Sequence, residues 1–459
     1  MSKTHTDLRN DFKDFWEESP RSHKHIKPAS LVLKNDPTTL FTGSGMQQLV
    51  PYLMGEKHPQ GKKLYNIQPC LRSQDIMEVG DNRHTTFFEM MGNWSLNDYF
   101  KEEQINWCFN YFTKTVDLNL KNLHFTVFEG TNDVPEDKES FDLWKSHGVP
   151  ENHIHKYGVD HNWWSRYGSP THMPEGEIGG PDSEVFYDFG ENLNIHEKSK
   201  YAATQCHPNC QCGRFLEIGN SVFIQYIKNK NGKLEELSQK NVDYGGGLER
   251  IAAAVNNNPD VFETDLYREI VMEIEKNVKK KYSDEKYQSQ FRIIADHLKA
   301  AVLLIINGVE PSNKEQGYVL RRFIRRTAVK MHQLGGGLTP LPGLESIIDR
   351  GILRVYDGVL GIDRSKQRSN VISVISKEAG KFSKTLDKGL REIEKLDFID
   401  GKTAFDLYQS FGFPLEITEE FAMVKNIKID DESFYKDFTI ELQKHQETSR
   451  KSAKKRFGH

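Results

Sequence analysis

The sequence lacks the apolar segments of a membrane-bound or secreted protein. Its longest apolar run, residues 300–306, is far shorter than the roughly 20 residues that a membrane-spanning helix needs, and it fits only a buried helix. The first ten residues contain no apolar core of the kind found in signal peptides. With 37% hydrophobic and 28% charged residues, the composition is ordinary for a soluble protein. We therefore expect a cytoplasmic protein.

Cysteine is scarce, with five residues in a chain of 459. An odd number of cysteines in a long chain of this character argues against a disulfide framework. Three of them, Cys206, Cys210 and Cys212, nevertheless share a seven-residue segment with His207. Zinc is one interpretation, because a thiolate-rich tetrahedral site tolerates such loops. The other, which we favour, is reduced loop cysteines, because the spacing lacks a paired C-x-x-C and adjacent cysteine and histidine rarely bind one ion.

The chain also has little net charge. A formal value of −4 gives no global indication of nucleic-acid binding. The local distribution is more informative, because residues 317–330 contain four arginines and one lysine without an acid. Residues 450–456 contain two more arginines and three lysines. Both segments are predicted to contact phosphates.

The length suffices for two or three domains. A helix is predicted over residues 5–19, ended by Pro20, and no internal repeat is evident. Up to about residue 255, strand-like runs such as 31–33, 125–128 and 222–226 alternate with helices and polar loops, which predicts an antiparallel sheet flanked by helices. Long helical segments follow, at 291–306, 317–331, 344–359 and 371–396. We expect an α+β fold with a sheet domain over 1–258 and a helical, RNA-facing domain over 259–459.

Residues 71–100 are the most informative stretch. Arg72 ends one strand-like run, a polar ten-residue loop follows, and a second run opens with Arg83-His84 and reaches Phe87-Phe88. When a carboxylate attacks the α-phosphorus of ATP, a fixed guanidinium stabilises the charge on the equatorial oxygens, and an aromatic ring can stack on adenine. Taken singly, Arg72 could be a surface ion-pair residue and the phenylalanines could be core. Their joint order favours an ATP-binding hairpin.

A second element, residues 242–255, is predicted to contain a strand end, a turn at the three glycines 245–247, and a helix. Glycines let the backbone approach a ligand, and the helix start presents N–H groups to it. Arg250 falls in the first turn of that helix, where its planar cation could cover the other face of adenine.

The segment 318–330 is predicted to be an amphipathic helix. On a helical wheel, apolar residues such as Val319 and Phe323 fall on one arc, and the arginines 321, 322, 325 and 326 fall on the other. We expect one buried face and one densely cationic face, whose like charges repel one another. Contact with an RNA backbone is the favoured interpretation, and a solvated charged face is the alternative.

These elements resemble motifs 2 and 3 of the class II aminoacyl-tRNA synthetases, and the surrounding sequence resembles the alanyl-tRNA synthetase family. The segments that carry the resemblance are 35–38 with 45–46, 88–93, 183–188, 215–218, 317–322 and 411–414, within a match from about residue 5 to the C-terminus. The resemblance implies a class II fold and alanine–tRNA ligase activity. It also implies ATP, Mg²⁺, alanine and tRNA(Ala) as cofactors and partners, and we expect a monomer.

The resemblance implies roles for individual residues. Arg72 would meet the α-phosphate, Arg83 would approach the outer phosphates, and Arg250 would complete the catalytic set. The implied ATP-binding residues are Arg72, Arg83, His84, Phe87, Phe88, Met90, Gly247 and Arg250. Magnesium would accompany ATP, with Glu184 and Asp188 either ordering it or serving as structural acids.

The resemblance also implies residues for the other two substrates. Asp243 would bind the amino group of alanine, since an anion facing an ammonium is a strong contact, and the alternative is a turn-capping carboxylate. The implied alanine-binding residues are Met46, Trp164, Asn220, Val222, Asp243 and Gly245. The implied tRNA-binding residues are Asn313, Arg321, Arg322, Arg325, Arg326 and Gln409.

The chain departs from the family pattern at three points. The loop after Arg72 is short and has no lysine, so transition-state charge is expected to be less fully compensated. Gln409 stands where the family has an aspartate, which puts family-like reading of a G·U pair in doubt. Editing and oligomerising domains are expected to be absent, in either a naturally short enzyme or a fragment.

Two other functions were weighed against tRNA charging. A related ligase that loads alanine onto a carrier protein or small amine is disfavoured by the arginine face. A catalytically silent RNA-binding regulator is disfavoured by the presence of Arg72, Asp243 and Arg250.

Overall fold

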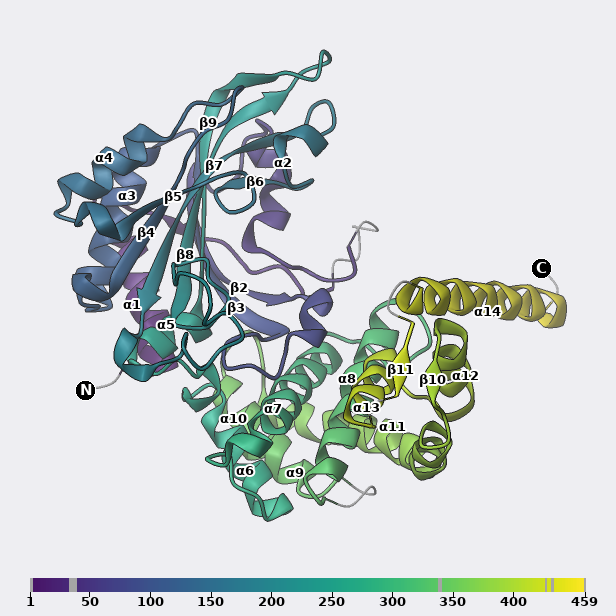
Figure 1. Ribbon diagram of the computed structural model, residues 1–459. Helices are drawn as coiled ribbons and strands as arrows, with labels where there is room; N and C mark the ends of the chain where they lie inside the picture. The colour runs from purple at the N-terminus through teal and green to yellow at the C-terminus, as the bar shows by residue number, and fades with distance from the viewer. Residues whose placement is uncertain (1–2, 33–38, 337–340, 426, 431–432, 458–459) are drawn as a thin grey trace. The chain divides into compact units, whose positions relative to one another are not determined.

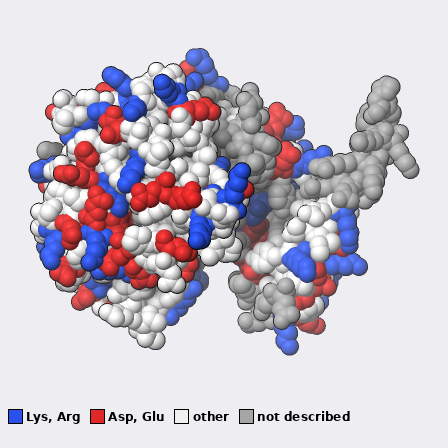
Figure 2. All heavy atoms as spheres, turned by 90° about the horizontal axis from the view of Figure 1, so that it is seen from above, with Lys and Arg blue, Asp and Glu red and all other residues white. Residues whose placement is uncertain are grey.

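The computed structural model describes residues 3–32, 39–336, 341–425, 427–430 and 433–457 (Figure 1). Contacts divide the chain into two compact units, Met1–Ile76 with Asp81–Arg268, and Met77–Gly80 with Glu269–His459. No helix in the described part of the chain has both the length and the apolarity needed to cross a membrane. On the face shown in Figure 2, acidic and basic side chains are mixed over most of the surface, in keeping with the net charge of −4.

The described residues of unit 1 form one nine-stranded sheet. Its order is β1 (Lys24–His25), β2 (Lys63–Leu71), β3 (Phe87–Leu96), β9 (Leu234–Gly247), β8 (Phe215–Lys228), β7 (Ile178–Asp188), β4 (Leu123–Phe128) and β5 (Ile154–Tyr157), with β6 (Trp163–Ser165) paired to β7. The central pairs are antiparallel, whereas β1–β2 and β4–β5 are parallel. The predicted α+β class is therefore confirmed, with a sheet that is mixed at its two edges.

Helices cover this sheet, and their apolar faces explain where they lie. α1 (His5–Glu17) is capped by Thr4 and buries Leu8, Phe12, Phe15 and Trp16. The Phe12 ring packs edge-on against Tyr65 of β2 at 6.3 Å. Together with α1, α3 (Lys101–Asn110) and α4 (Lys138–Ser146) lie along one side of the sheet in Figure 1, while α2 (Val50–Leu53) and α5 (Leu248–Val255) are short. The predicted helix 5–19 is confirmed, although it ends two residues early because Glu18 is extended.

Unit 2 is helical. Its helices are α6 (Arg268–Val278), α7 (Glu285–Ile306), α8 (Glu315–Gln333), α9 (Leu344–Ser346), α10 (Arg354–Tyr356), α11 (Arg364–Ile393), α12 (Gly401–Phe411), α13 (Leu415–Lys425) and α14 (Phe434–Phe457). A small parallel pair joins β10 (Phe398–Ile399) to β11 (Lys428–Ile429). α8 packs between α7 and α11, and α12 packs between α11 and α14. The predicted helices 291–306, 317–331 and 371–396 are confirmed within longer or shifted bounds.

A predicted helix and a predicted strand differ from the structure. The predicted helix 344–359 is interrupted by a π-helical stretch, Ile347–Leu353, and ends at Tyr356. A Cβ on Gly351 would lie 2.9 Å from the Cα of Ile270, so this stretch approaches α6 closely. Residues 31 and 32 form bends instead of a strand, and residue 33 lies outside the described residues.

The three glycines 245–247 do not form the predicted turn. They are the last residues of β9, paired with Gly92, Met91 and Met90 of β3, and α5 begins directly after them. Close packing explains the glycine at 245, since a Cβ there would lie 2.9 Å from Sδ of Met90. Glycine therefore allows neighbouring groups to approach this end of β9 closely. The predicted place of Arg250 in the first helical turn is confirmed.

Candidate active site

One pocket of unit 1, about 90 Å³ in volume, collects residues from β3, β8, β9, the β2–β3 loop and the start of α5. All the predicted ATP-binding residues except Phe87 line it. The pocket is also lined by residues that were given no ATP-binding role: Asp75, Thr85, Glu217, Gly245 and Glu249. Segments separated by about 175 residues thus supply one site, because β3 and β9 are neighbours in the sheet.

Arg72 and Phe88 form one wall of this pocket. The Arg72 guanidinium carbon lies 5.0 Å from the centre of the Phe88 ring. Its Nε donates a hydrogen bond of 3.2 Å to the carbonyl oxygen of Gly43. A cation held over an aromatic face by a second contact has few orientations available, so the guanidinium is oriented before a ligand arrives.

Phe87 does not belong to this wall, and its predicted role in ATP binding is wrong. Neighbouring strand residues point to opposite faces of a sheet, so Phe88 and Met90 reach the pocket while Phe87 points away. The Phe87 side chain is 0% exposed. A ring without exposed surface cannot stack on a nucleotide.

Arg83 and His84 are anchored by residues outside the predicted set. Arg83 Nη2 donates to the main-chain oxygen of Gln211 at 2.9 Å and to its Oε1 at 3.0 Å. Asp81 pairs with Nδ1 of His84 at 2.7 Å and lies 3.8 Å from Nε of Arg83. Burial opposes ionisation of Asp81, but its bonds to His84 and to the backbone lower its pKa to about 2. Asp81 is therefore a fixed anion that orients both side chains.

Arg250 is held by Glu217, a residue in the segment 215–218 that was assigned no role. Arg250 Nη1 donates to Oε2 of Glu217 at 2.9 Å. Glu249 is 2% exposed, and its carboxylate accepts a hydrogen bond from the Glu89 N–H at 3.1 Å. The pocket thus combines three arginines with three carboxylates, those of Asp75, Glu217 and Glu249.

Neither of the predicted magnesium-ordering acids lines this pocket. Asp188 is bound by Arg214 at 2.7 Å, and Glu184 is buried, with its Oε2 accepting from the Thr126 hydroxyl at 3.0 Å. Both serve as structural acids here, which was the alternative interpretation. The carboxylates that do line the pocket are those of Asp75, Glu217 and Glu249.

The predicted alanine-binding residues gather around Trp94, which was not predicted. The Trp94 Nε1–H donates to Oδ1 of Asp243 at 2.7 Å. Desolvation raises the pKa of Asp243 to about 7, although the Trp94 hydrogen bond opposes this. Asp243 lies inside β9, paired with Val222, so it does not cap a turn.

Trp94 is fixed by two glycines. A Cβ on Gly45 would lie 2.8 Å from the indole, and a Cβ on Gly92 would lie 2.6 Å from it. Met46, Val222 and Trp164 pack in the same apolar cluster as Trp94. The indole is therefore a fixed platform that positions the Asp243 carboxylate among apolar side chains.

Asn220 and Gly245 connect this cluster to the pocket that the predicted ATP-binding residues line. They face each other across β8 and β9, and Gly245 lines the pocket. The buried Oδ1 of Asn220 accepts no hydrogen bond from the described residues, which leaves an acceptor for a ligand. Asn220 also hydrogen-bonds Asp182. Burial raises the pKa of Asp182 to about 7, although its hydrogen bonds with Asn162 and Asn220 lower it.

Unit 2 contains a cavity of about 330 Å³ that brings together four of the predicted tRNA-binding residues, Asn313, Arg321, Arg325 and Gln409. Its lining also includes Lys381, His445 and the rings of Phe382, Tyr408 and Phe411, and none of the described side chains that line it is acidic. Cationic and aromatic side chains around an open cavity are the combination that binds unpaired nucleotides.

The prediction of an open cationic face on α8 is wrong. Arg326 is 2% exposed and is paired, like Lys330, with Glu420, and Arg322 is paired with Glu416. Arg321 and Arg325 share Glu378, at 3.0 and 2.8 Å. A helical wheel cannot show these acids, because they come from α11 and α13. The side chains of the basic segment 450–456 lie outside the described residues.

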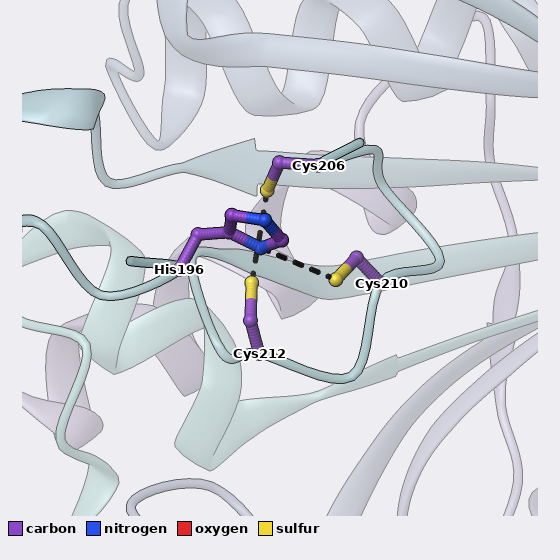
Figure 3. Close-up of side chains that lie close together, drawn as sticks. All are labelled: His196, Cys206, Cys210 and Cys212. Carbon is purple, nitrogen blue, oxygen red and sulfur yellow. Dashed lines mark hydrogen bonds between the residues drawn. The ribbon is translucent and has the colours of Figure 1, made fainter. Parts of the chain in front are cut away.

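The three cysteines of the segment 206–212 come together, but the histidine beside them is His196 instead of His207 (Figure 3). His207 Nδ1 instead contacts the Tyr157 hydroxyl at 2.8 Å. His196 precedes the cysteine segment by ten residues, so no local spacing indicated it.

Comparisons with known proteins agree with this geometry. A family model described as tRNA synthetases class II (A) matches residues 7–458. An alanine–tRNA ligase of Borreliella afzelii (strain PKo) is 40% identical over 461 residues, which covers 98% of this chain and 73% of the relative. One of Treponema denticola is 39% identical, with the same coverage of 98% and 73%. The apo structure of S. aureus histidyl-tRNA synthetase gives a TM-score of 0.32 at 12% identity, covering 55% of this chain and 65% of that one, which is too low to support an inference.

Proposed function

We propose that this chain, which belongs to the class II (A) tRNA synthetase family, is an alanine–tRNA ligase. The observation that carries the proposal is the single pocket of unit 1 in which Arg72, Arg83 and Arg250 meet, next to the Trp94–Asp243 pair. Three cations beside one small, partly apolar cluster suit a reaction between a nucleoside triphosphate and a small amino acid.

In the first step, a carboxylate oxygen of alanine attacks the α-phosphorus of ATP, the bond to the bridging oxygen breaks, and pyrophosphate leaves. Arg72 stabilises the charge that develops on the α-phosphate, and Arg83 and Arg250 hold the outer phosphates and adenine. Asp243 binds the ammonium of alanine, and the vacant Oδ1 of Asn220 is a second acceptor for it. Catalysis therefore rests on positioning and charge, without an acid or base from the chain.

Magnesium, when bound, neutralises part of the phosphate charge. The pocket residues suited to hold its water and phosphate shell are Glu217 and Glu249, since hard cations prefer carboxylate oxygen. Glu217 would therefore serve both the ion and Arg250, whose Nη1 donates to it.

In the second step, a ribose hydroxyl of the terminal adenosine of tRNA attacks the carbonyl carbon of alanyl-adenylate, and AMP leaves. We assign RNA binding to the unit 2 cavity with Asn313, Arg321, Arg325, Lys381 and Gln409. Arg322 and Arg326, which are paired with acids of α13, are assigned a structural role.

One experiment separates this function from its two alternatives. Alanine-dependent exchange of pyrophosphate into ATP should occur with the purified chain, and alanine should then pass to tRNA(Ala). Exchange without transfer to tRNA would favour a ligase with another acceptor. Binding of tRNA without exchange would favour a silent RNA-binding protein.

The KM for alanine should depend on pH because of Asp243. With a pKa of about 7 in the empty pocket, Asp243 takes up a proton as the pH falls below 7 and loses the charge that attracts the ammonium. We therefore expect the alanine KM in pyrophosphate exchange to rise up to about tenfold per pH unit below 7. Asp182 titrates in the same range, so an Asp243→Asn variant is the control and should show a flatter profile. If the alanine KM of Asp243→Asn depends on pH as steeply as that of the wild type, a group other than Asp243 causes the pH dependence.

Changes in the unit 2 cavity should affect tRNA alone. The double change Arg321→Ala and Arg325→Ala should raise the tRNA KM and reduce the slope of log KM against log salt by about 1.5–2, because each of the two lost phosphate contacts removes its share of counterion release. Pyrophosphate exchange should be retained.

That double variant leaves the buried Glu378 without its two arginines, which destabilises unit 2. Lys381→Ala avoids this problem, because Lys381 lines the same cavity with an exposed side chain. Arg368→Ala, which removes a partly exposed arginine paired with Glu345 and Asp349 outside the cavity, is the control. An unaltered salt slope in both cavity variants would place RNA binding elsewhere.

A further inference from the structure

The long connection between β7 and β8, residues 189–214, has almost no regular structure of its own. It contains one short 3-10 turn, Glu191–Leu193, and otherwise bends and irregular backbone. Structureless loops longer than about 12–15 residues are uncommon in compact domains unless something orders them. Within this loop, the four ligand atoms of His196, Cys206, Cys210 and Cys212 all lie within 4.8 Å of one another.

We propose that His196, Cys206, Cys210 and Cys212 bind one zinc ion that holds this loop together. The side chains converge on a common centre (Figure 3). Cys206 Sγ lies 3.7 Å from Cys212 Sγ, and Cys210 Sγ lies 3.6 Å from Nδ1 of His196. With Zn–S near 2.3 Å and Zn–N near 2.1 Å, neighbouring ligands of a tetrahedral site are separated by about 3.6–3.8 Å. Both of these distances match that geometry, and all four ligand atoms lie within 4.8 Å of one another.

The groups around the cluster also suit a metal. Nε2 of His196 lies 2.8 Å from the carbonyl oxygen of Thr204. A carbonyl can only accept, so Nε2 carries the hydrogen and Nδ1 turns its lone pair to the cysteines, as a histidine ligand requires. The Arg214 N–H donates to Sγ of Cys212 at 3.4 Å, a contact that stabilises a thiolate. At 3.7 Å, the two sulfurs are far too distant for a disulfide, whose S–S bond is about 2.05 Å.

The ligand types select the metal and its role. Three thiolates and one imidazole in a tetrahedron are typical of zinc and exclude the oxygen-preferring Mg²⁺ and Ca²⁺. Four protein ligands leave no open position for water or substrate. The ion is therefore structural, and it takes no part in the chemistry of the pocket.

The metal would nevertheless affect the ATP pocket through Gln211. This residue stands between two of the ligands, Cys210 and Cys212, and accepts two hydrogen bonds from Nη2 of Arg83. A Cβ on Gly213, at φ 94°, would lie 2.7 Å from Nη1 of Arg83, so the loop backbone approaches this side chain closely. The cysteine loop thus holds Arg83 through Gln211 and lies against it at Gly213. This consequence rests on the proposed function, whereas the metal site itself does not.

Metal content tests the site without reference to activity. The full chain, purified without added metal, should contain about one equivalent of zinc by elemental analysis. A mercurial that blocks thiols should release the same amount, measured with a zinc-binding dye, which tests the wild-type chain even where a variant fails to fold. Wild-type protein that is free of zinc, and that takes up none when zinc is added, would overturn the proposal.

Matched variants test the ligand set. His196→Gln and Cys210→Ser should lose the zinc. His207→Gln, whose histidine contacts Tyr157 instead, and Cys108→Ser, a free buried cysteine, should keep it. Loss of zinc from His207→Gln with retention in His196→Gln would show that the ligands are wrongly assigned.

Kinetics then test the link to Arg83. In His196→Gln, the ATP KM in pyrophosphate exchange should rise about 10- to 100-fold, because a displaced arginine loses its alignment with the phosphates, while the alanine KM changes little. A zinc-free variant with an unchanged ATP KM would refute the link and leave the metal site standing. A wild-type chain with zinc but without exchange would count against the proposed function only.

Discussion

Arg72→Ala is expected to lower the rate of alanine-dependent pyrophosphate exchange by about 10²–10³-fold, the usual cost of removing one fixed donor to developing charge. Arg72 lies on the wall of the ATP pocket, held by the carbonyl of Gly43 and by the Phe88 ring. The loop after it carries no lysine that could take its place. The loss should fall on kcat, since the charge that Arg72 stabilises is greatest during the attack.

Two companion variants make this test specific. Arg72→Lys keeps the charge but loses the planar fork and should recover only part of the activity. Arg368→Ala removes a partly exposed arginine of unit 2 and should leave exchange unchanged. If Arg72→Ala retains exchange within about threefold of the wild type, Arg72 has no part in the mechanism.

Asp243→Asn should raise the alanine KM by about 10- to 100-fold, with a much smaller effect on the ATP KM. The amide preserves the shape, and its oxygen can still accept the hydrogen bond from Trp94, but the charge that meets the ammonium is lost. A hydrogen bond to a charged group contributes about 1.5–3 kcal/mol, which corresponds to this range. Initial rates of exchange at varied alanine concentration measure the change.

Thermal stability separates a binding defect from a folding defect in this variant. Because desolvation raises the pKa of Asp243, the ionised carboxylate is unfavourable in the empty pocket above pH 7. The asparagine variant should therefore be at least as stable as the wild type at pH 8. An unchanged alanine KM in a stable variant would assign the ammonium to another acceptor.

The sequence predicted the parts of the site that depend on local pattern. Strand alternation and a helix start can both be recognised within a few residues of sequence. These patterns predict the positions of Arg72, Phe88 and Arg250 in the pocket. The same alternation excludes Phe87, which the structure buries. That correction was available from the sequence, since neighbouring residues on a strand cannot both face one ligand.

Residues that depend on distant partners could not be predicted in this way. Trp94 hydrogen-bonds Asp243, which lies 149 residues away in the sequence, and Arg83 hydrogen-bonds Gln211, which lies 128 residues away. The arginines of α8 looked like an open cationic face because Glu378 and Glu420 lie more than 50 positions further along the chain. Periodicity describes one helix at a time, whereas charge compensation is decided between helices.

The platform of Trp94 limits how this pocket can change its specificity. Its indole is pressed against Gly45 and Gly92, where no side chain fits. A larger residue at either glycine would therefore displace the indole. The Nε1–H that donates to Asp243 would move with it. Met46 and Val222 pack in the same apolar cluster as the indole, and their side chains can be shortened to make room for a larger or more polar amino acid. Altered substrate choice, by design or by natural variation, should begin with those two side chains.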